Sequence, residues 1–180
     1  FSALGFLSKY LFIYILASIF IYFLFNLNKF KKCIPNYFLA IIISLIILSP
    51  HFYWLFENDF KTIVYGLNRS ALIEPTLINN LKNPLVFLIK QFTILIPFFL
   101  MFLVLIKKIK LKVNLKNKKT LFLIYVSVVP ILLVLVTSII TGAQIRTMWM
   151  TPFYLLFGTL FIEILKKNID LKKIKKFYVI

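Results

Sequence analysis

Acidic residues, glycine and cysteine are scarce in this sequence. Its 180 residues include five Asp and Glu against 22 Lys and Arg, with four glycines, one histidine and one cysteine. The single cysteine, Cys33, excludes an intrachain disulfide and a cysteine-based metal site, and we interpret it as an inert loop thiol. The sequence contains no Gly-rich phosphate loop. His51 has no second His or Cys near it, so no metal site of the usual spacing is predicted.

Hydrophobic residues are abundant instead. They make up 62% of the chain, aromatic residues make up 18%, and the mean hydropathy is +0.96, which is far outside the range of soluble domains. Continuous apolar stretches favour helices over strands, because backbone groups in lipid must satisfy their own hydrogen bonds. We therefore predict an all-α polytopic membrane helix bundle. Five stretches reach the ~20 residues that a helix needs to cross a bilayer, and they are roughly 3–26, 35–56, 85–106, 120–141 and 147–165.

The lysines predict the orientation of these helices. The net charge of +17 would suggest nucleic acid in a soluble protein, but most of the basic residues fall in three clusters between or after apolar runs, near 27–34, 107–119 and 166–180. All three clusters share one side if the helices alternate. By the positive-inside rule this side, including the basic tail at 166–180, is cytoplasmic, and 57–84 faces outward with the turn at 142–146. We expect the lysines to meet anionic lipid headgroups and expect no nucleic acid partner.

The outward segment holds most of the acidic residues and a short helical pattern. Apolar residues recur at helical spacing over 59–72, which predicts an amphipathic helix on the outer surface that Pro75 ends. This helix places Tyr65 and Arg69 four residues apart on one flank, and a guanidinium can hold a phosphate through two hydrogen bonds at once. The alternative is that Arg69 only reaches lipid headgroups.

Other polar residues lie at or inside the ends of apolar runs. His51 and Glu57 could form an acid/base pair, but His51 and Trp54 at a helix end are more typical of interfacial anchors. Lys90 lies about one turn inside the outward end of its helix, so we expect it to extend to the interface. The depth of Lys9 stays open, and we expect it to face protein, water or an interface. Prolines within the runs, Pro97 and Pro130, predict kinks.

Four segments in order along the chain resemble one family. They are LGFLSKY (4–10), LSPHFYWLFENDFKTIVYGLNR (48–69), FLIKQFTILIPFF (87–99) and GAQIRTMWMTPFYLLFG (142–158). Together they resemble the later membrane region of the bacterial protein-mannosyltransferase-like glycosyltransferases, family 39. The chain begins with Phe inside an apolar segment, so we expect it to be the C-terminal membrane piece of a longer protein.

The resemblance implies a GT-C fold enzyme of the bacterial inner membrane. Such an enzyme transfers a sugar from a polyprenyl-phosphate donor to a lipid, glycan or protein acceptor at the outer face. In that family the catalytic acidic residues lie on the first outer loop, which we expect upstream of Phe1, so no catalytic residue is assigned here and metal dependence stays open. A lipid-linked donor needs cations for its phosphate and an apolar groove. We predict that the donor phosphate is bound by Arg69, Arg146 and Lys61, and that the cavity is lined by His51, Trp54, Glu57, Tyr65 and Trp149.

A non-catalytic multipass protein, such as a transporter or flippase half or an assembly subunit, is the alternative. It would predict polar residues deep in several helices or broken helices at matching positions of two repeats. The sequence has no internal repeat and no evident ion path, which makes the transferase the better interpretation.

Overall fold

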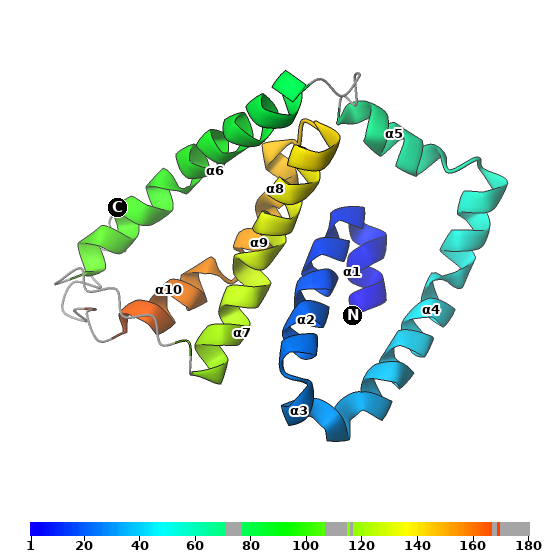
Figure 1. The fold of residues 1–180 in the computed structure, drawn as a ribbon, viewed down its shortest axis with the longest axis horizontal. Helices are drawn as coiled ribbons and strands as arrows, with labels where there is room; N and C mark the ends of the chain where they lie inside the picture. The colour runs from blue at the N-terminus through cyan, green and yellow to red at the C-terminus, as the bar shows by residue number, and fades with distance from the viewer. Residues whose placement is uncertain (71–76, 107–114, 116, 167–168, 170–180) are drawn as a thin grey trace.

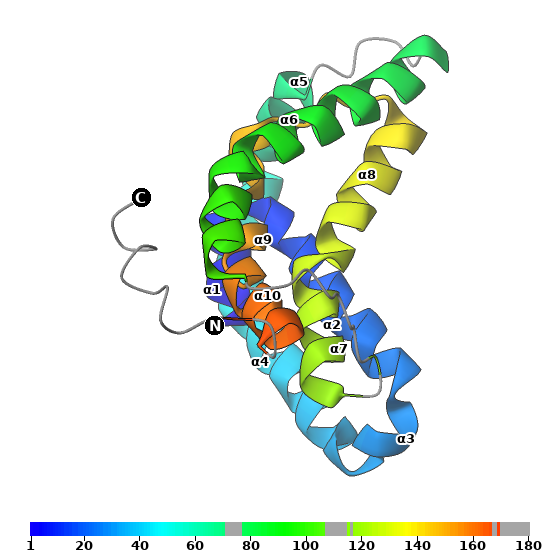
Figure 2. The ribbon, with the colours of Figure 1, turned by 90° about the vertical axis from the view of Figure 1, so that its left-hand side faces the viewer.

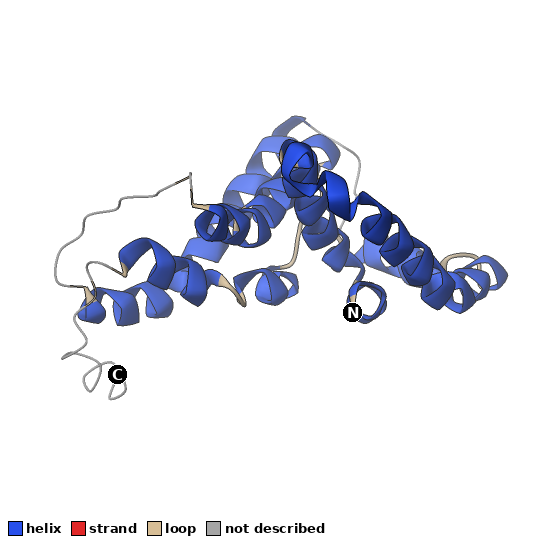
Figure 3. Cartoon of the chain, turned by 90° about the horizontal axis from the view of Figure 1, so that it is seen from below, coloured by secondary structure: helices blue, strands red, loops and turns tan. Residues whose placement is uncertain are grey.

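The computed structural model describes residues 1–70, 77–106, 115, 117–166 and 169, and these residues form helices without a strand among them (Figure 3). The helices are α1 (Ser2–Ser8), η1 (Tyr10–Phe12), α2 (Ile13–Phe25), α3 (Leu27–Phe30), η2 (Lys31–Cys33), α4 (Ile34–Glu57), α5 (Lys61–Arg69), α6 (Leu77–Leu105), α7 (Lys118–Ser127), α8 (Val129–Thr141), η3 (Thr147–Met150), α9 (Thr151–Tyr154) and α10 (Phe157–Leu165). The prediction of an all-α membrane bundle is confirmed.

Three helical stretches are long and apolar enough to cross a bilayer. They are Leu27–Glu57, Ile78–Leu105 and Lys118–Thr141, of 31, 28 and 24 residues. A fourth span exists if Thr147–Tyr154 and Phe157–Leu165 count as one, although the two helices meet at a bend of 49°. Of the five predicted segments, the last is thus bent and the first is interrupted.

The interruption of the first segment lies at Lys9. Its backbone is extended, with φ −154° and ψ 122°, so α1 ends there and the helix restarts at Tyr10. The remaining apolar helix, Tyr10–Phe25, is shorter than the other spans. Gly5 permits the close fold-back, because a Cβ atom at this position would lie 2.6 Å from the ring of Phe12. Hydropathy alone gives no sign of this break, since Ser8 and Lys9 lie between two apolar runs.

The helices form an open arrangement in which α4 and α6 occupy opposite outer sides (Figure 1). Between them lie α2 and the α7–α8 pair, and α8 packs against both α2 and α6. In two views α3 and the start of α7 lie at one end, whereas α5 and the end of α8 lie at the other (Figure 2). The described basic segment near 27–34 and the segment at 57–70 thus lie at opposite ends. The membrane face that each end meets, and the domain limits given above, remain predictions.

The core lies where the central helices meet. Its buried apolar residues come from α2, α6, α7, α8, η3 and α9, and they are Ile15, Phe87, Val126, Val134, Met150 and Phe153. Burial of such side chains supplies the dispersion contacts that hold helices together when lipid is as apolar as the protein. The core therefore fixes η3 and α9 against α6 and α8, directly after the 142–146 turn.

The outer helix α4 has the opposite character. Only 11% of the most apolar 18-residue stretch of its span is buried within the chain, and bulky apolar side chains stay exposed along it, including Ile41, Ile42, Leu45 and Ile46. Such a surface would be unfavourable in water and is typical of a helix whose solvent is lipid.

The amphipathic helix predicted over 59–72 is α5, which is shorter. Asp59 and Phe60 adopt the left-handed conformation, with φ 50° and 53°, and this turn separates α4 from α5. The apolar side chains of α5 remain exposed. The predicted stop at Pro75, together with Glu74, lies outside the described residues, as do most of the basic loop and tail.

The two predicted proline kinks differ. The helix α6 continues through Pro97, whereas Pro130 lies in the first turn of α8, just after α7 ends at Ser127. A proline lacks the N–H that an interior helical position needs, so the start of a new helix is its most favourable place.

Candidate functional site

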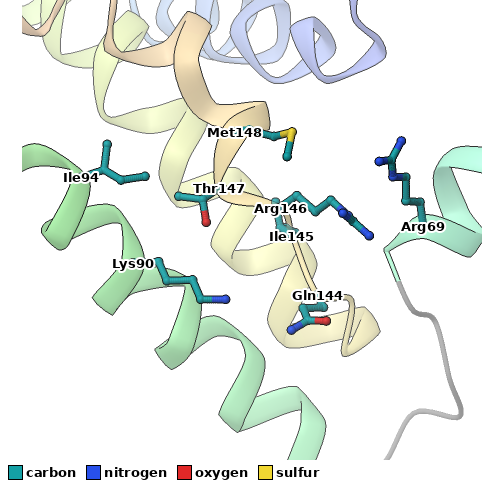
Figure 4. Close-up of a pocket in the computed structure, with 8 residues that line it drawn as sticks. All are labelled: Arg69, Lys90, Ile94, Gln144, Ile145, Arg146, Thr147 and Met148. Carbon is teal, nitrogen blue, oxygen red and sulfur yellow. The ribbon is translucent and has the colours of Figure 1, made fainter.

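A cavity of about 540 Å³ lies between the end of α5, the middle of α6 and the segment from the 142–146 turn to the start of η3 (Figure 4). This volume is within the range of small-ligand sites. The lining residues are Arg69, Lys90, Ile94, Gln144, Ile145, Arg146, Thr147 and Met148. Segments far apart in the sequence therefore contribute to one site.

The end of α5 is tied to the 142–146 turn by the backbone. The N–H of Gln144 donates to the Ser70 carbonyl at 2.9 Å, and the Ser70 hydroxyl donates back to the Leu67 carbonyl at 2.8 Å. These bonds satisfy carbonyls that a helix end would otherwise leave free. As a result, Arg69 and Arg146 line the same cavity, with Lys90 on its other side (Figure 4).

The turn that carries Arg146 is itself fixed from two sides. Gly142 ends α8 in the left-handed conformation, with φ +67°, and its carbonyl accepts a hydrogen bond from Asn83 Nδ2 at 2.7 Å. The buried Ser138 hydroxyl donates to the Ala143 carbonyl at 2.7 Å. Because Asn83 belongs to α6 and Ser138 to α8, the turn is held by both of these helices.

The lining side chains carry positive charge and no negative charge. Arg69, Lys90 and Arg146 are the charged lining residues, and no acidic partner contacts them within the described ranges. The Arg69 Nη1 donates to the Tyr65 hydroxyl at 2.6 Å, and the guanidinium lies 5.5 Å from the centre of that ring. The cations thus retain capacity for an anion, and their proximity creates a positive local field that attracts one.

Other residues predicted for the site lie elsewhere. His51 Nε2 is hydrogen-bonded to the Tyr10 hydroxyl at 2.9 Å, and this hydroxyl lies 2.7 Å from Thr62 Oγ1. Trp54 stacks on His51 with ring centres 6.1 Å apart. This cluster joins η1, α4 and α5 and does not line the cavity described above.

Three further predicted residues also lie outside the lining. Glu57 and Lys61 are exposed at the end of α4 and the start of α5, and Trp149 is half-buried in η3. Within the described part of the chain, no group of three His, Cys, Asp or Glu residues is arranged to hold a metal ion.

Sequence reasoning omitted several lining residues from the site. The sequence predicts only that Lys90 extends to the interface, and it indicates no role for Gln144 or Thr147. The available signal is a group of three polar residues, Gln144, Arg146 and Thr147, between two apolar runs. Placing Lys90 beside that turn required the packing of α6 on α8.

The cavity lies beyond the part of the chain that matches a known family. No curated protein and no solved structure matches this chain significantly. Residues 1–54, which run from α1 to near the end of α4, match the family model described as Dolichyl-phosphate-mannose-protein mannosyltransferase, so that this membrane segment is similar to a family of membrane glycosyltransferases.

Proposed function

We propose that this chain is part of a GT-C glycosyltransferase of the bacterial inner membrane, related to family 39. It transfers a sugar from a polyprenyl-phosphate donor to a lipid, glycan or protein acceptor at the outer face. Arg69 and Arg146 bind the donor phosphate. The observation that carries the proposal is the joint lining of one cavity by these two arginines and Lys90, without an acidic residue among the lining side chains.

Phosphate recognition agrees with the chemistry of the lining. Each guanidinium can donate two parallel hydrogen bonds to phosphate oxygens, and the Gln144 amide and Thr147 hydroxyl supply neutral donors. Charge-assisted bonds of this kind are stronger than bonds between neutral groups.

A lipid-linked phosphate also agrees with the apolar part of the lining. Ile94, Ile145 and Met148 share the cavity with the cations. A polyprenyl phosphate has the same two-part character, because its charged head is joined to a hydrocarbon chain. The head would meet the arginines while the first prenyl carbons contact the apolar side chains.

The similarity of residues 1–54 to membrane mannosyltransferases supports the reaction class. In glycosyl transfer the anomeric carbon leaves the donor phosphate and joins an acceptor oxygen. Cations at the phosphate stabilise the charge that develops there, and a carboxylate activates the acceptor. The cavity lining provides the first of these functions only, which agrees with catalytic acids elsewhere in the complete protein.

The proposal is tested with the complete gene product in native membranes. Arg69→Ala and Arg146→Ala should each raise the KM for a polyprenyl-phosphate hexose by roughly tenfold or more, because each removes charge-assisted hydrogen bonds. Lys82→Ala is the matched control, since Lys82 lies on α6 as Lys90 does but does not line the cavity. Sugar transfer is measured at a fixed acceptor concentration.

The proposal would be wrong if a protein that carries both Arg69→Ala and Arg146→Ala kept the wild-type transfer rate and the wild-type KM for the donor. Donor binding that depends on both arginines without any sugar transfer would instead favour a lipid-phosphate carrier of the flippase type.

A further inference from the structure

Lys90 gives the cavity a third positive charge from a third element. Arg69 ends α5, Arg146 precedes η3, and Lys90 lies on α6 across the cavity from Arg69 (Figure 4). Two arginines already provide the donors that two phosphate oxygens require. A third cation with no acidic partner among the described residues raises the repulsion within the site until an anion occupies it.

The two lipid phosphates of the proposed reaction differ in charge. The donor is a phosphodiester between the polyprenol and the sugar, so it carries one negative charge and two terminal oxygens. The product is a polyprenyl phosphate monoester with three terminal oxygens, and its second ionisation, at a pKa of about 6, brings it close to two negative charges at neutral pH. Three cations match the monoester better than the diester.

We propose that the cavity binds a dianionic phosphate monoester in preference to a phosphodiester, and that Lys90 provides this preference. The inference rests on the proposed function and specifies which phosphate the site favours. A lysine suits this role because its ammonium is a compact charge on a flexible stem that can approach an extra oxygen without the planar geometry of arginine. The Gln144 amide and Thr147 hydroxyl add neutral donors to that oxygen.

The preference has a consequence for the proposed transfer. The bond between the anomeric carbon and the phosphate oxygen breaks, and its electron pair stays on that oxygen. The anomeric carbon bonds to the acceptor oxygen, whose proton passes to a carboxylate. A site that favours the monoester stabilises the charge that appears on the phosphate during this step, so Lys90 accelerates transfer rather than donor capture. The same preference retains the product and slows its release.

Binding to the complete protein in lipid nanodiscs tests the inference without relying on turnover. The probes are decyl phosphate, a monoester, and methyl decyl phosphate, a diester with the same chain. At about pH 7.5 the wild-type protein should bind the monoester roughly five- to tenfold more tightly. At about pH 5 the monoester carries close to one charge, so the preference should fall to within about twofold.

Variants separate the contribution of Lys90 from general charge effects. Lys90→Gln should abolish the preference for the monoester at the higher pH, and Lys82→Gln, which removes a charge from the same helix outside the cavity, should leave it intact. Both lysines are exposed, so neither change removes a buried contact.

Each failure has a distinct signature. Equal wild-type affinity for the two probes, or a preference that survives in Lys90→Gln, overturns the inference while leaving the proposed function in place. Absence of binding for both probes, or diester binding that Arg69→Gln and Arg146→Gln do not weaken, counts against the proposed function itself. The wild-type pH comparison tests the preference even if a variant folds poorly.

Discussion

Tyr65 and Arg69 lie on the same flank of α5 and are hydrogen-bonded to each other. This contact determines how many of the Arg69 guanidinium donors are available to a ligand. The Tyr65 hydroxyl accepts from Nη1 at 2.6 Å, which leaves the other guanidinium donors free. An exposed arginine samples many rotamers, so a hydrogen bond that limits them lowers the entropy lost when a phosphate binds. Tyr65 therefore acts as a positioning residue for Arg69 in the proposed site.

At the residue scale, Tyr65→Phe should weaken donor binding because it removes this hydrogen bond and keeps the ring under the guanidinium. We expect a rise in the donor KM of about two- to tenfold with a smaller change in kcat. Tyr37→Phe is the matched control, because Tyr37 lies near the start of α4, at the end of that helix remote from α5. Arg69→Lys should also raise the donor KM, because a lysine ammonium lacks the planar fork of the guanidinium. An unchanged donor KM in Tyr65→Phe would refute the positioning role.

The turn between α8 and η3 is the element on which the cavity depends. It carries Gln144 and Arg146, it joins α5 through Ser70, and it is held by amide and hydroxyl side chains of α6 and α8. Its conformation requires a left-handed residue at Gly142. A change at this glycine should therefore act on the site from a distance.

At the element scale, Gly142→Ala should destabilise the turn. The left-handed conformation costs a non-glycine residue about 1–2 kcal/mol, and the new Cβ would lie 2.5 Å from Asn80 Oδ1. We expect a lower Tm in detergent and weaker binding of the monoester probe. Gly66→Ala is the control, because a Cβ there would have no atom within 4 Å other than its own helical backbone and chain neighbours, and alanine favours a helix by about 0.5–1 kcal/mol. Equal Tm values for the two variants would contradict this account.

The basic loop near residues 27–34 and the cavity lie at opposite ends of the molecule. Lys29, Lys31 and Lys32 lie at the end with α3 and η2, whereas the cavity and α5 lie at the other. Lysine-rich loops are retained on the cytoplasmic side during membrane insertion. The cavity would then open outward, where a lipid-linked sugar and an extracytoplasmic acceptor can meet.

At the scale of the molecule, labelling of cysteines in spheroplasts tests this orientation. A membrane-impermeant maleimide should leave Cys33 unlabelled until the membrane is permeabilised. In a Cys33→Ser background, Lys61→Cys should react without permeabilisation, because Lys61 is exposed on α5 at the opposite end. Labelling with the reverse pattern would place the cavity on the cytoplasmic side and remove the proposed access to an outer acceptor.

Local sequence signals predicted the helices well and the interruption at Lys9 poorly. Continuous apolar runs determine that helices form, because every backbone group in lipid must bond within its own segment. The extended backbone at Lys9 depends on the ring of Phe12 lying against Gly5, which is a packing contact that hydropathy does not report. The bend between α9 and α10 lies at residues 155 and 156, and neither of these is a proline or a glycine.

The candidate site was predictable in part. Arg69 and Arg146 were selected as outward cations, and the cavity contains both. Lys61 is predicted as the third outward cation, yet the third cation that lines the cavity is Lys90. A lysine on the same helix is not necessarily on the same face, whereas a lysine on another helix becomes a neighbour once the two helices pack.

The sequence by itself determined the class of molecule, the positions of its main helices and the uneven distribution of its charge, because these depend on the hydropathy and charge of neighbouring residues. Only the tertiary structure decided which cations share a cavity. That outcome depends on the hydrogen bond from Gln144 to Ser70 and on the packing of α6 against α8, which join residues separated by whole helices. Interactions between such distant segments arise from the complementarity of their surfaces, and no short stretch of sequence contains that information.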